Sequence, residues 1–246
     1  MLLLYKSCCF VGGTAGKPVT VSPHYFMALR PKTFVYVDGY NLYYRAVRGT
    51  PYKWLNIQQL CEQVLPDNDV VKIKYFTADM HSRVDPQKRI RQEIFLRALR
   101  TLPKLEIIKG KYVTYKVRRE VAQPGWRNRL RRGLGLPAGM NPTVSVYDPK
   151  EKRSDVNLAV HLLNDAWHNR YDVAVVLSND SDQLEAMRVV RHERGKAIGI
   201  INPHNYPNLE LYKLANFKVE LRPVMLAAAQ FPSTIPGTTI HKPTSW

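Results

Sequence analysis

Acidic residues and cysteines are scarce in this chain of 246 residues. The three cysteines, Cys8, Cys9 and Cys61, lack the number and spacing of a disulfide framework or a zinc site. We therefore expect this protein in the reducing environment of the cytoplasm. No internal repeat or sustained heptad is present, which argues against a solenoid or a coiled coil. The apolar runs are too short for a membrane-spanning helix, and we expect no membrane partner.

The shortage of acidic residues leaves a strong positive charge. There are 37 Lys and Arg against 20 Asp and Glu, for a formal net charge of +17. A soluble protein this basic usually meets a polyanion, most often nucleic acid, although a basic surface can also serve solubility alone.

The charge is concentrated in one part of the chain. Residues 83–132 hold sixteen Lys and Arg but four Asp and Glu. The densest stretch combines arginines with one indole, which suits phosphate contacts and base stacking, and a solvated loop is the alternative. The predicted RNA-binding residues are Arg118, Arg119, Trp126, Arg127, Arg129, Arg131 and Arg132.

Strand and helix patterns alternate along the chain. Short β-branched or apolar runs predict strands at 33–38, 70–78, 105–109, 172–177, 196–201 and 217–221. Apolar residues at helical spacing predict helices at 55–65, 86–101, 155–167, 181–193 and 208–214. Such alternation predicts an α/β fold, a mostly parallel sheet with helices on both faces.

The remaining segments divide the chain. Residues 112–147 contain two strand-like stretches around a basic excursion, which we interpret as a hairpin-like insertion in a main domain of residues 33–222. Residues 1–32 are predicted to be a poorly structured extension. Its short apolar start is interrupted by Lys6 and has no basic region before it, which argues against a signal peptide. Residues 223–246 hold four prolines without a regular period and are predicted to be a tail.

Four aspartates stand where strands end or helices begin. Asp38 ends the first strand, Asp180 and Asp182 follow the strand at 172–177, and Asp155 opens a helix. In parallel sheets the functional crevice lies at the carboxyl ends of the strands. Converging carboxylates repel one another unless a cation is present, and Mg²⁺ or Mn²⁺ prefers such oxygen ligands. Each aspartate taken alone also suits a turn or a helix cap.

Three motifs in order carry a family resemblance. FVYVDGYNLYY, EKRSDVNLAVHLLNDA and VVLSNDSD resemble the NYN domain family of the PIN-like nuclease superfamily from about Phe34 to Leu221. The resemblance implies a PIN-like three-layer α/β/α sandwich and a metal-dependent (endo)ribonuclease using Mg²⁺ or Mn²⁺. A relative usually has glycine where this chain has Arg153.

The resemblance also assigns roles. The implied catalytic residues are Asp38, Asn41, Asp155, Asp180 and Asp182, of which the four aspartates are the implied metal ligands. Ser178 and Asn157 are possible supporting residues, while Ser178 also suits a helix cap.

Other residues near these motifs have more than one interpretation. Asp165 lies ten positions beyond Asp155, about 15 Å along a helix, so it cannot share the same ion. Tyr40, Tyr43, Tyr44 and Trp54 follow the first acid, and such aromatics either stack on bases or pack in the core.

Two other functions are compatible with acids at strand ends. A phosphatase with an aspartate nucleophile needs a second Asp two residues after the first, and Tyr40 occupies that place. A non-catalytic RNA-binding or scaffold protein of the same fold is the alternative to the ribonuclease, although all four aspartates are present. The expected partner is RNA, with a homodimer or a regulatory protein as a further possibility.

Overall fold

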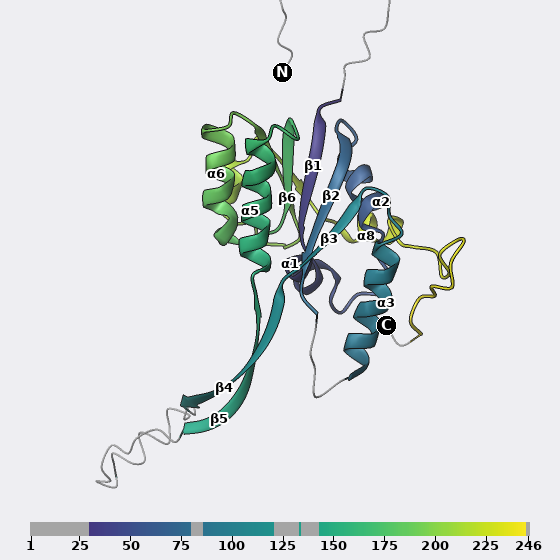
Figure 1. Ribbon diagram of the computed structural model, residues 1–246, viewed down its shortest axis with the longest axis vertical. Helices are drawn as coiled ribbons and strands as arrows, with labels where there is room; N and C mark the ends of the chain where they lie inside the picture. The colour runs from purple at the N-terminus through teal and green to yellow at the C-terminus, as the bar shows by residue number, and fades with distance from the viewer. Residues whose placement is uncertain (1–29, 80–85, 121–132, 134–142, 245–246) are drawn as a thin grey trace, which may run out of the picture.

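The computed structural model describes residues 30–79, 86–120, 133 and 143–244 (Figure 1). A six-stranded sheet forms its centre, in the order β3-β2-β1-β6-β7-β8, and every neighbouring pair is parallel. Its strands are β1 (Lys32–Asp38), β2 (Asp69–Thr77), β3 (Leu105–Lys109), β6 (Val173–Leu177), β7 (Ala197–Asn202) and β8 (Phe217–Glu220). The predicted parallel sheet is confirmed.

Helices cover both faces of the sheet and complete the predicted three-layer sandwich (Figure 1). One face packs against α2 (Ile57–Val64), α3 (Pro86–Leu99) and α8 (Pro223–Ala228). The other packs against α5 (Ser154–Trp167), α6 (Leu184–His192) and α7 (Leu209–Leu214). Successive residues of β1 point to opposite faces, so Val35 and Val37 enter one core while Tyr36 enters the other.

Local chemistry explains where several helices begin. The Asn56 side chain accepts a hydrogen bond from the Gln59 backbone N–H (3.0 Å) and caps α2. Asn208 caps α7 in the same way, accepting from Glu210 and Leu211. These caps satisfy backbone donors that the first turn of a helix leaves without partners.

The C-terminal segment that we predicted to be a tail is part of the folded core. It forms α8 from Pro223 onward. The segment buries Leu226, Ala229, Phe231, Ile235 and Ile240 in the core. The segment also bonds to the chain before α2, because the Trp54 indole N–H donates to the Pro232 carbonyl (2.7 Å). Its apolar residues are irregularly spaced because they face distant partners rather than one side of a long helix.

The predicted basic insertion is an antiparallel hairpin that projects from the sandwich (Figure 1). Its strands are β4 (Lys111–Glu120) and β5 (Thr143–Lys152). Residues 121–132 and 134–142, between β4 and β5 in the chain, lie outside the described part of the structure, as do residues 1–29 of the predicted extension. Lys32, which we assigned to that extension, is the first residue of β1.

The path of the chain creates a crevice at the carboxyl edge of the sheet. From β1 the chain adds β2 and β3 on one side, then adds β6, β7 and β8 on the other. The connections from β1 and β6 therefore leave in opposite directions, and such switch points hold ligands in open α/β sheets. None of the described helices has the length and apolar character needed to cross a membrane.

Candidate metal centre

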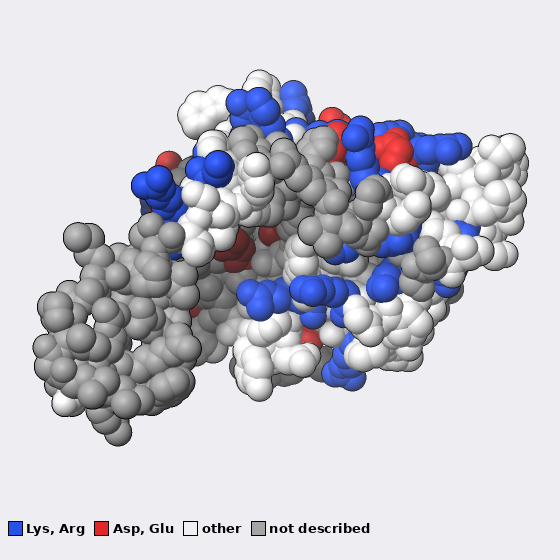
Figure 2. All heavy atoms as spheres, turned by 90° about the horizontal axis from the view of Figure 1, so that it is seen from below, with Lys and Arg blue, Asp and Glu red and all other residues white. Residues whose placement is uncertain are grey.

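Three of the predicted aspartates meet at this switch point. Asp38 is the last residue of β1, Asp180 follows the end of β6, and Asp155 lies in the first turn of α5. One carboxylate oxygen of each lies within 4.8 Å of the others; Asp38 is buried, and the other two are partly buried. In Figure 2 acidic side chains lie in a hollow of this face, with Lys and Arg side chains around it.

Ser178 connects two of the three acids. Its hydroxyl donates to Asp38 Oδ2 (3.0 Å), and its oxygen accepts from the Asp180 backbone N–H (3.1 Å). The hydroxyl is buried with the end of β6, so it fixes the distance between the two acidic segments. Ser178 is thus a direct neighbour of the cluster.

An asparagine pair fastens the loops beside the acids. The Asn41 side-chain oxygen accepts from the Asn179 backbone N–H (3.2 Å). The Asn179 side chain in turn donates to the Tyr206 carbonyl (2.9 Å) and accepts from the Asn208 N–H (2.7 Å). Sequence reasoning missed Asn179, although its position between Ser178 and Asp180 was the available signal.

The aspartates act as caps as well as members of the cluster. Asp38 Oδ1 accepts from the Asn41 N–H (2.9 Å) at the start of α1 (Gly39–Leu42). Asp180 Oδ1 accepts from the Asp182 N–H (3.1 Å). A carboxylate has about four acceptor sites, so these bonds leave capacity for a cation. The two interpretations of the sequence are therefore compatible.

Asp182 stands apart from the other three. Its side chain is exposed, and the carboxylates whose oxygens lie within 4.8 Å of one another are those of Asp38, Asp155 and Asp180. Asp182 lies in a single turn, Ser181–Gln183, before α6. The structure therefore brings three of the four predicted acids together and leaves the fourth beside them.

The entry into α5 has an unusual backbone. Arg153 has φ of +79°, in the left-handed region that favours glycine. Its carbonyl accepts from the N–H of the half-buried Asn157 (2.7 Å). The substitution noticed in the sequence therefore sits at a strained position two residues before Asp155.

The predicted RNA-binding residues are only partly within the described structure. Arg118 and Arg119 lie on β4 with exposed side chains. The remaining five, Trp126, Arg127, Arg129, Arg131 and Arg132, fall outside the described residues.

The donor set fits a hard divalent cation. Oxygen ligands lie about 2.0–2.6 Å from Mg²⁺ or Ca²⁺, so two ligands of one ion are separated by at most about 5 Å. The 4.8 Å limit among Asp38, Asp155 and Asp180 meets this requirement. Three carboxylates this close also repel one another, which a divalent ion would relieve.

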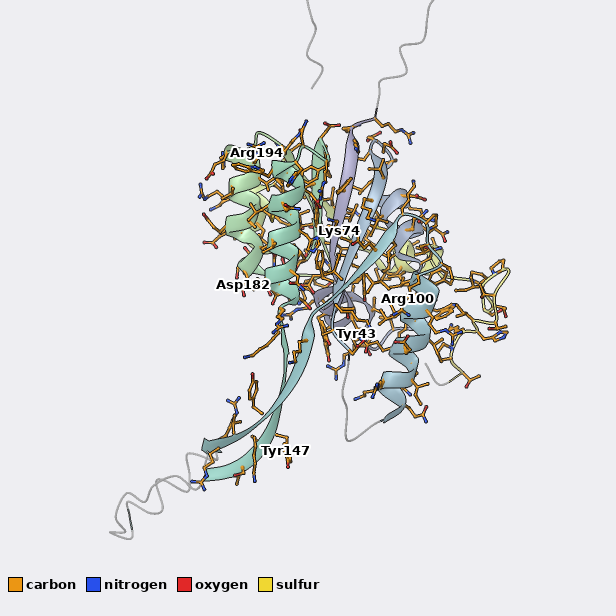
Figure 3. All side chains as sticks on the ribbon, viewed as in Figure 1. Tyr43, Lys74, Arg100, Tyr147, Asp182 and Arg194 are labelled. Atoms are coloured by element: carbon orange, nitrogen blue, oxygen red, sulfur yellow. The ribbon has the colours of Figure 1, made fainter. Side chains whose placement is uncertain are left out.

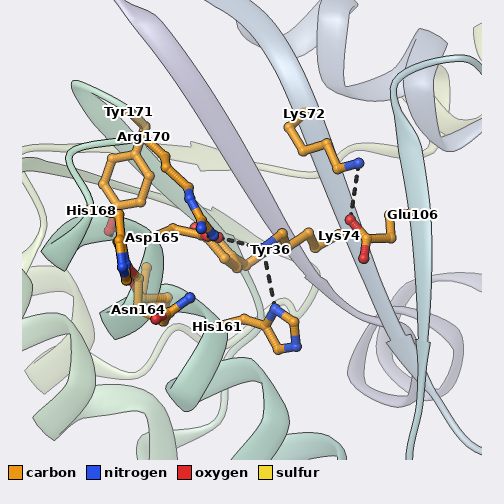
Figure 4. A network of polar contacts seen from close by, with 11 residues as sticks. Tyr36, Lys72, Lys74, Glu106, His161, Asn164, Asp165, His168, Arg170 and Tyr171 are labelled. Atoms are coloured by element: carbon orange, nitrogen blue, oxygen red, sulfur yellow. Dashed lines mark hydrogen bonds and ion pairs between the residues drawn. The ribbon is translucent and has the colours of Figure 1, made fainter.

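A second charged cluster lies deeper, on the α5 face of β1 and β2 (Figure 4). The fully buried Asp165 carboxylate accepts from Lys74 Nζ (2.5 Å), the Tyr36 hydroxyl (2.7 Å) and Arg170 Nη1 (2.8 Å). Burial by itself would raise the pKa of Asp165, but these three donors outweigh it and hold the pKa below its usual range. Asp165 therefore anchors α5 to the sheet.

The NYN domain model matches residues 32–216, so this chain belongs to the NYN domain family, whose fold is of the nuclease type. The suspected family and the α/β PIN-like fold are thus confirmed.

Two individual proteins are also similar. The chain is 33% identical over 243 residues to 6-hydroxy-3-succinoylpyridine 3-monooxygenase HspA of Pseudomonas putida, covering 87% of this chain and 75% of that protein. A protein of unknown function from Vibrio parahaemolyticus has a crystal structure that matches 79% of this chain and 94% of its own, with 17% identity and a TM-score of 0.48.

Proposed function

We propose that this protein is a cytoplasmic, metal-dependent ribonuclease that hydrolyses phosphodiester bonds of RNA. The observation that carries the proposal is the convergence of Asp38, Asp155 and Asp180 at the sheet's switch point. Membership of a family with a nuclease-type fold supports the same chemistry. The net charge of +17 supports a polyanionic substrate.

The three carboxylates would hold Mg²⁺ or Mn²⁺. A bound divalent ion lowers the pKa of water and neutralises negative charge that develops on a phosphate. In hydrolysis the water oxygen bonds to phosphorus, the bond from phosphorus to one ribose oxygen breaks, and that oxygen receives a proton. Ser178 and Asn41 would keep the acids in place through their bonds to Asp38 and Asn179.

The other predicted residues take supporting roles in this proposal. Asp182 would add a fourth carboxylate beside the cluster, and Asn157 would support the first turn of α5. Arg118 and Arg119 on the hairpin would contact RNA phosphates together with the basic residues between β4 and β5. Phosphate contacts of this kind hold the substrate but carry little sequence information.

The direct test measures RNA cleavage. Purified protein is incubated with pooled RNA in Mn²⁺, Mg²⁺ or EDTA, beside Asp180→Asn and a matched Asp67→Asn control at an exposed turn. We expect cleavage that needs the metal, is lost in Asp180→Asn and persists in Asp67→Asn. RNA binding with no cleavage under any of these conditions would instead support the non-catalytic alternative.

The name of the relative favours a second candidate, oxygenation of a small aromatic acid. The 33% identity with a monooxygenase spans most of this chain, and a cavity beside Asp38 is lined by tyrosines and basic residues. A monooxygenase transfers one atom of O₂ to its substrate and reduces the other to water with two electrons from a donor. Oxygen consumption with 6-hydroxy-3-succinoylpyridine, NADH and a flavin tests this candidate, and the ribonuclease proposal expects none above background.

A further inference from the structure

A cavity of about 490 Å³ opens beside the acid cluster, a size typical of small-molecule sites. Gly39 and Tyr40, which directly follow Asp38, line it. Tyr75 lines it too, and its ring packs so closely on Gly39 that a Cβ there would lie 2.6 Å from it. The cavity therefore begins directly after the end of β1, next to Asp38 in the chain.

Aromatic rings form another part of this cavity. Tyr40 and Tyr44 are stacked, with ring centroids 6.2 Å apart and planes 13° apart, and Tyr43 meets Tyr44 edge-on at 5.2 Å. Tyr43 and Tyr44 are exposed to 36% and 46%, whereas Trp54 is buried in the core. Both exposed tyrosines belong to a π-helical turn, Tyr43–Val47, a rare conformation that is frequent at functional sites.

Positive charge surrounds these rings. Arg48, Lys53, Lys88 and Arg91 line the cavity, and its described lining contains no Asp or Glu. The Arg48 guanidinium carbon lies 5.4 Å from the centroid of the Tyr44 ring. Tyrosines alone suit any flat ring and cations alone suit any anion, so their combination selects a flat aromatic group that carries negative charge.

We propose that this cavity binds one nucleotide of the substrate RNA, with its base against Tyr43 and Tyr44 and its phosphate near the basic side chains. This assignment rests on the proposed ribonuclease function, because the residues that directly follow Asp38, Gly39 and Tyr40, line the cavity. Tyr43 lies at the carboxyl end of the sheet, the end from which the hairpin projects (Figure 3). In this assignment the neighbouring phosphodiester of the strand lies toward the acid cluster.

The experiment measures binding of two nucleotides, uridine 5′-monophosphate and adenosine 5′-monophosphate. EDTA is present, so that neither metal nor cleavage contributes. Uridine, inorganic phosphate and pyridine-3-carboxylate serve as comparison ligands. We expect Tyr44→Ala to weaken nucleotide binding about 5- to 150-fold, the range for losing one base stack. Tyr44→Phe keeps the ring and should retain the affinity. Tyr147→Ala, on the exposed hairpin strand β5, should leave it unchanged.

A charge variant separates the two parts of the ligand. Lys53→Gln with Lys88→Gln should weaken binding of the monophosphate but leave that of the nucleoside unchanged. Equal binding of nucleotide and inorganic phosphate, insensitive to Tyr44→Ala, would overturn the assignment. Tyr44-dependent binding of pyridine-3-carboxylate without nucleotide binding would also overturn it, in favour of a free aromatic acid.

The binding result is independent of the proposed activity. Asp180→Asn should bind the monophosphate as well as the unaltered protein does in EDTA, even though it is expected not to cleave RNA. Nucleotide binding without any RNA cleavage would contradict the ribonuclease function alone. Cleavage with no nucleotide bound in the cavity would contradict the cavity assignment alone.

Discussion

Arg153 shows how one residue stores strain beside a candidate site. Its left-handed φ of +79° costs an L-residue about 1–2 kcal/mol, and the strain sits where β5 gives way to α5. Glycine adopts this conformation freely but loses more entropy on folding, by about 0.5–1 kcal/mol. The two terms act in opposite directions, and the strain is the larger.

We therefore expect Arg153→Gly to raise the free energy of unfolding by about 0.5–1 kcal/mol, the difference between these terms. Arg153→Ala is the matched control, because it removes the guanidinium but keeps the strained backbone of an L-residue. Urea denaturation of the three proteins gives the comparison. A glycine variant no more stable than the alanine variant would show that the strain is absent.

Asp165 makes stability depend on pH. Its pKa is depressed in the folded protein, so the unfolded chain binds the proton more readily. The contribution to stability is fully present above the unfolded pKa of about 3.9 and is lost as the pH falls through the lower folded value. We expect the free energy of unfolding to fall below about pH 4, and to do so less steeply in Asp165→Asn.

The same variant should be less stable at neutral pH. Removing the Asp165 charge leaves the buried Lys74 ammonium without its ion-pair partner, which costs about 3–5 kcal/mol for buried pairs. Lys74→Met added to Asp165→Asn should recover part of this loss, because no unpaired buried ammonium remains. Thermal unfolding at pH 7 makes the comparison, and equal melting of the single variant and the original chain would contradict the anchoring role.

At the scale of elements, the C-terminal segment completes the core. The ring centroids of Phe231 and Trp54 lie 5.5 Å apart, and the Phe231 backbone N–H donates to the Trp54 carbonyl (2.9 Å). Leu55 also pairs with Gln230 in an antiparallel bridge. A segment after the last strand thus covers the loop that leads into α2. Its removal would expose the face of the sheet that α2 and α8 share.

We expect a chain that ends at Arg222 to fail to fold or to aggregate, contrary to the interpretation of the segment as a tail. A milder variant, Phe231→Ala, should cost about 3–5 kcal/mol through the lost contacts and the cavity left behind. Circular dichroism with thermal unfolding tests both proteins. Full stability of the truncated chain would show that the segment packs on the core without supporting it.

At the scale of the whole molecule, the hairpin carries basic residues of β4 away from the sandwich (Figure 1). The hairpin projects from the carboxyl end, while Arg194 lies near the opposite end (Figure 3). RNA held by the acid cluster would meet the hairpin side of the molecule. We therefore expect the basic residues that contribute to RNA binding on the hairpin side of the molecule.

Salt dependence tests this expectation. Each phosphate neutralised on a single strand contributes about 0.7 to the log–log slope of affinity against salt, so Arg118→Gln with Arg119→Gln should flatten it by about 1.4. Arg194→Gln with Lys196→Gln removes the same charge and should leave the slope unchanged. Affinity for a short single-stranded RNA is measured over a salt series in an Asp180→Asn background. Equal slopes in the two variants would mean that net charge, not the hairpin, attracts RNA.

The sequence by itself determined the parts that depend on local pattern. The alternation of β-branched runs with helical faces defined the parallel sheet, because period-two and period-3.6 patterns are visible within one element. Asp38, Asp155 and Asp180 were found because each ends a strand, follows one or opens a helix, and the carboxyl ends of parallel strands share one edge.

Only the tertiary structure decided which distant residues touch. Loop conformations decide the hydrogen bonds from Trp54 to Pro232 and from Ser178 to Asp38. They also decide that Asp182 lies outside the group of three close carboxylates. Which aromatic residues are exposed, such as Tyr44 at the cavity, and which are buried, such as Trp54, depends on where the chain turns after α1. These contacts join residues far apart in the chain or within irregular turns, where no period in the sequence encodes them.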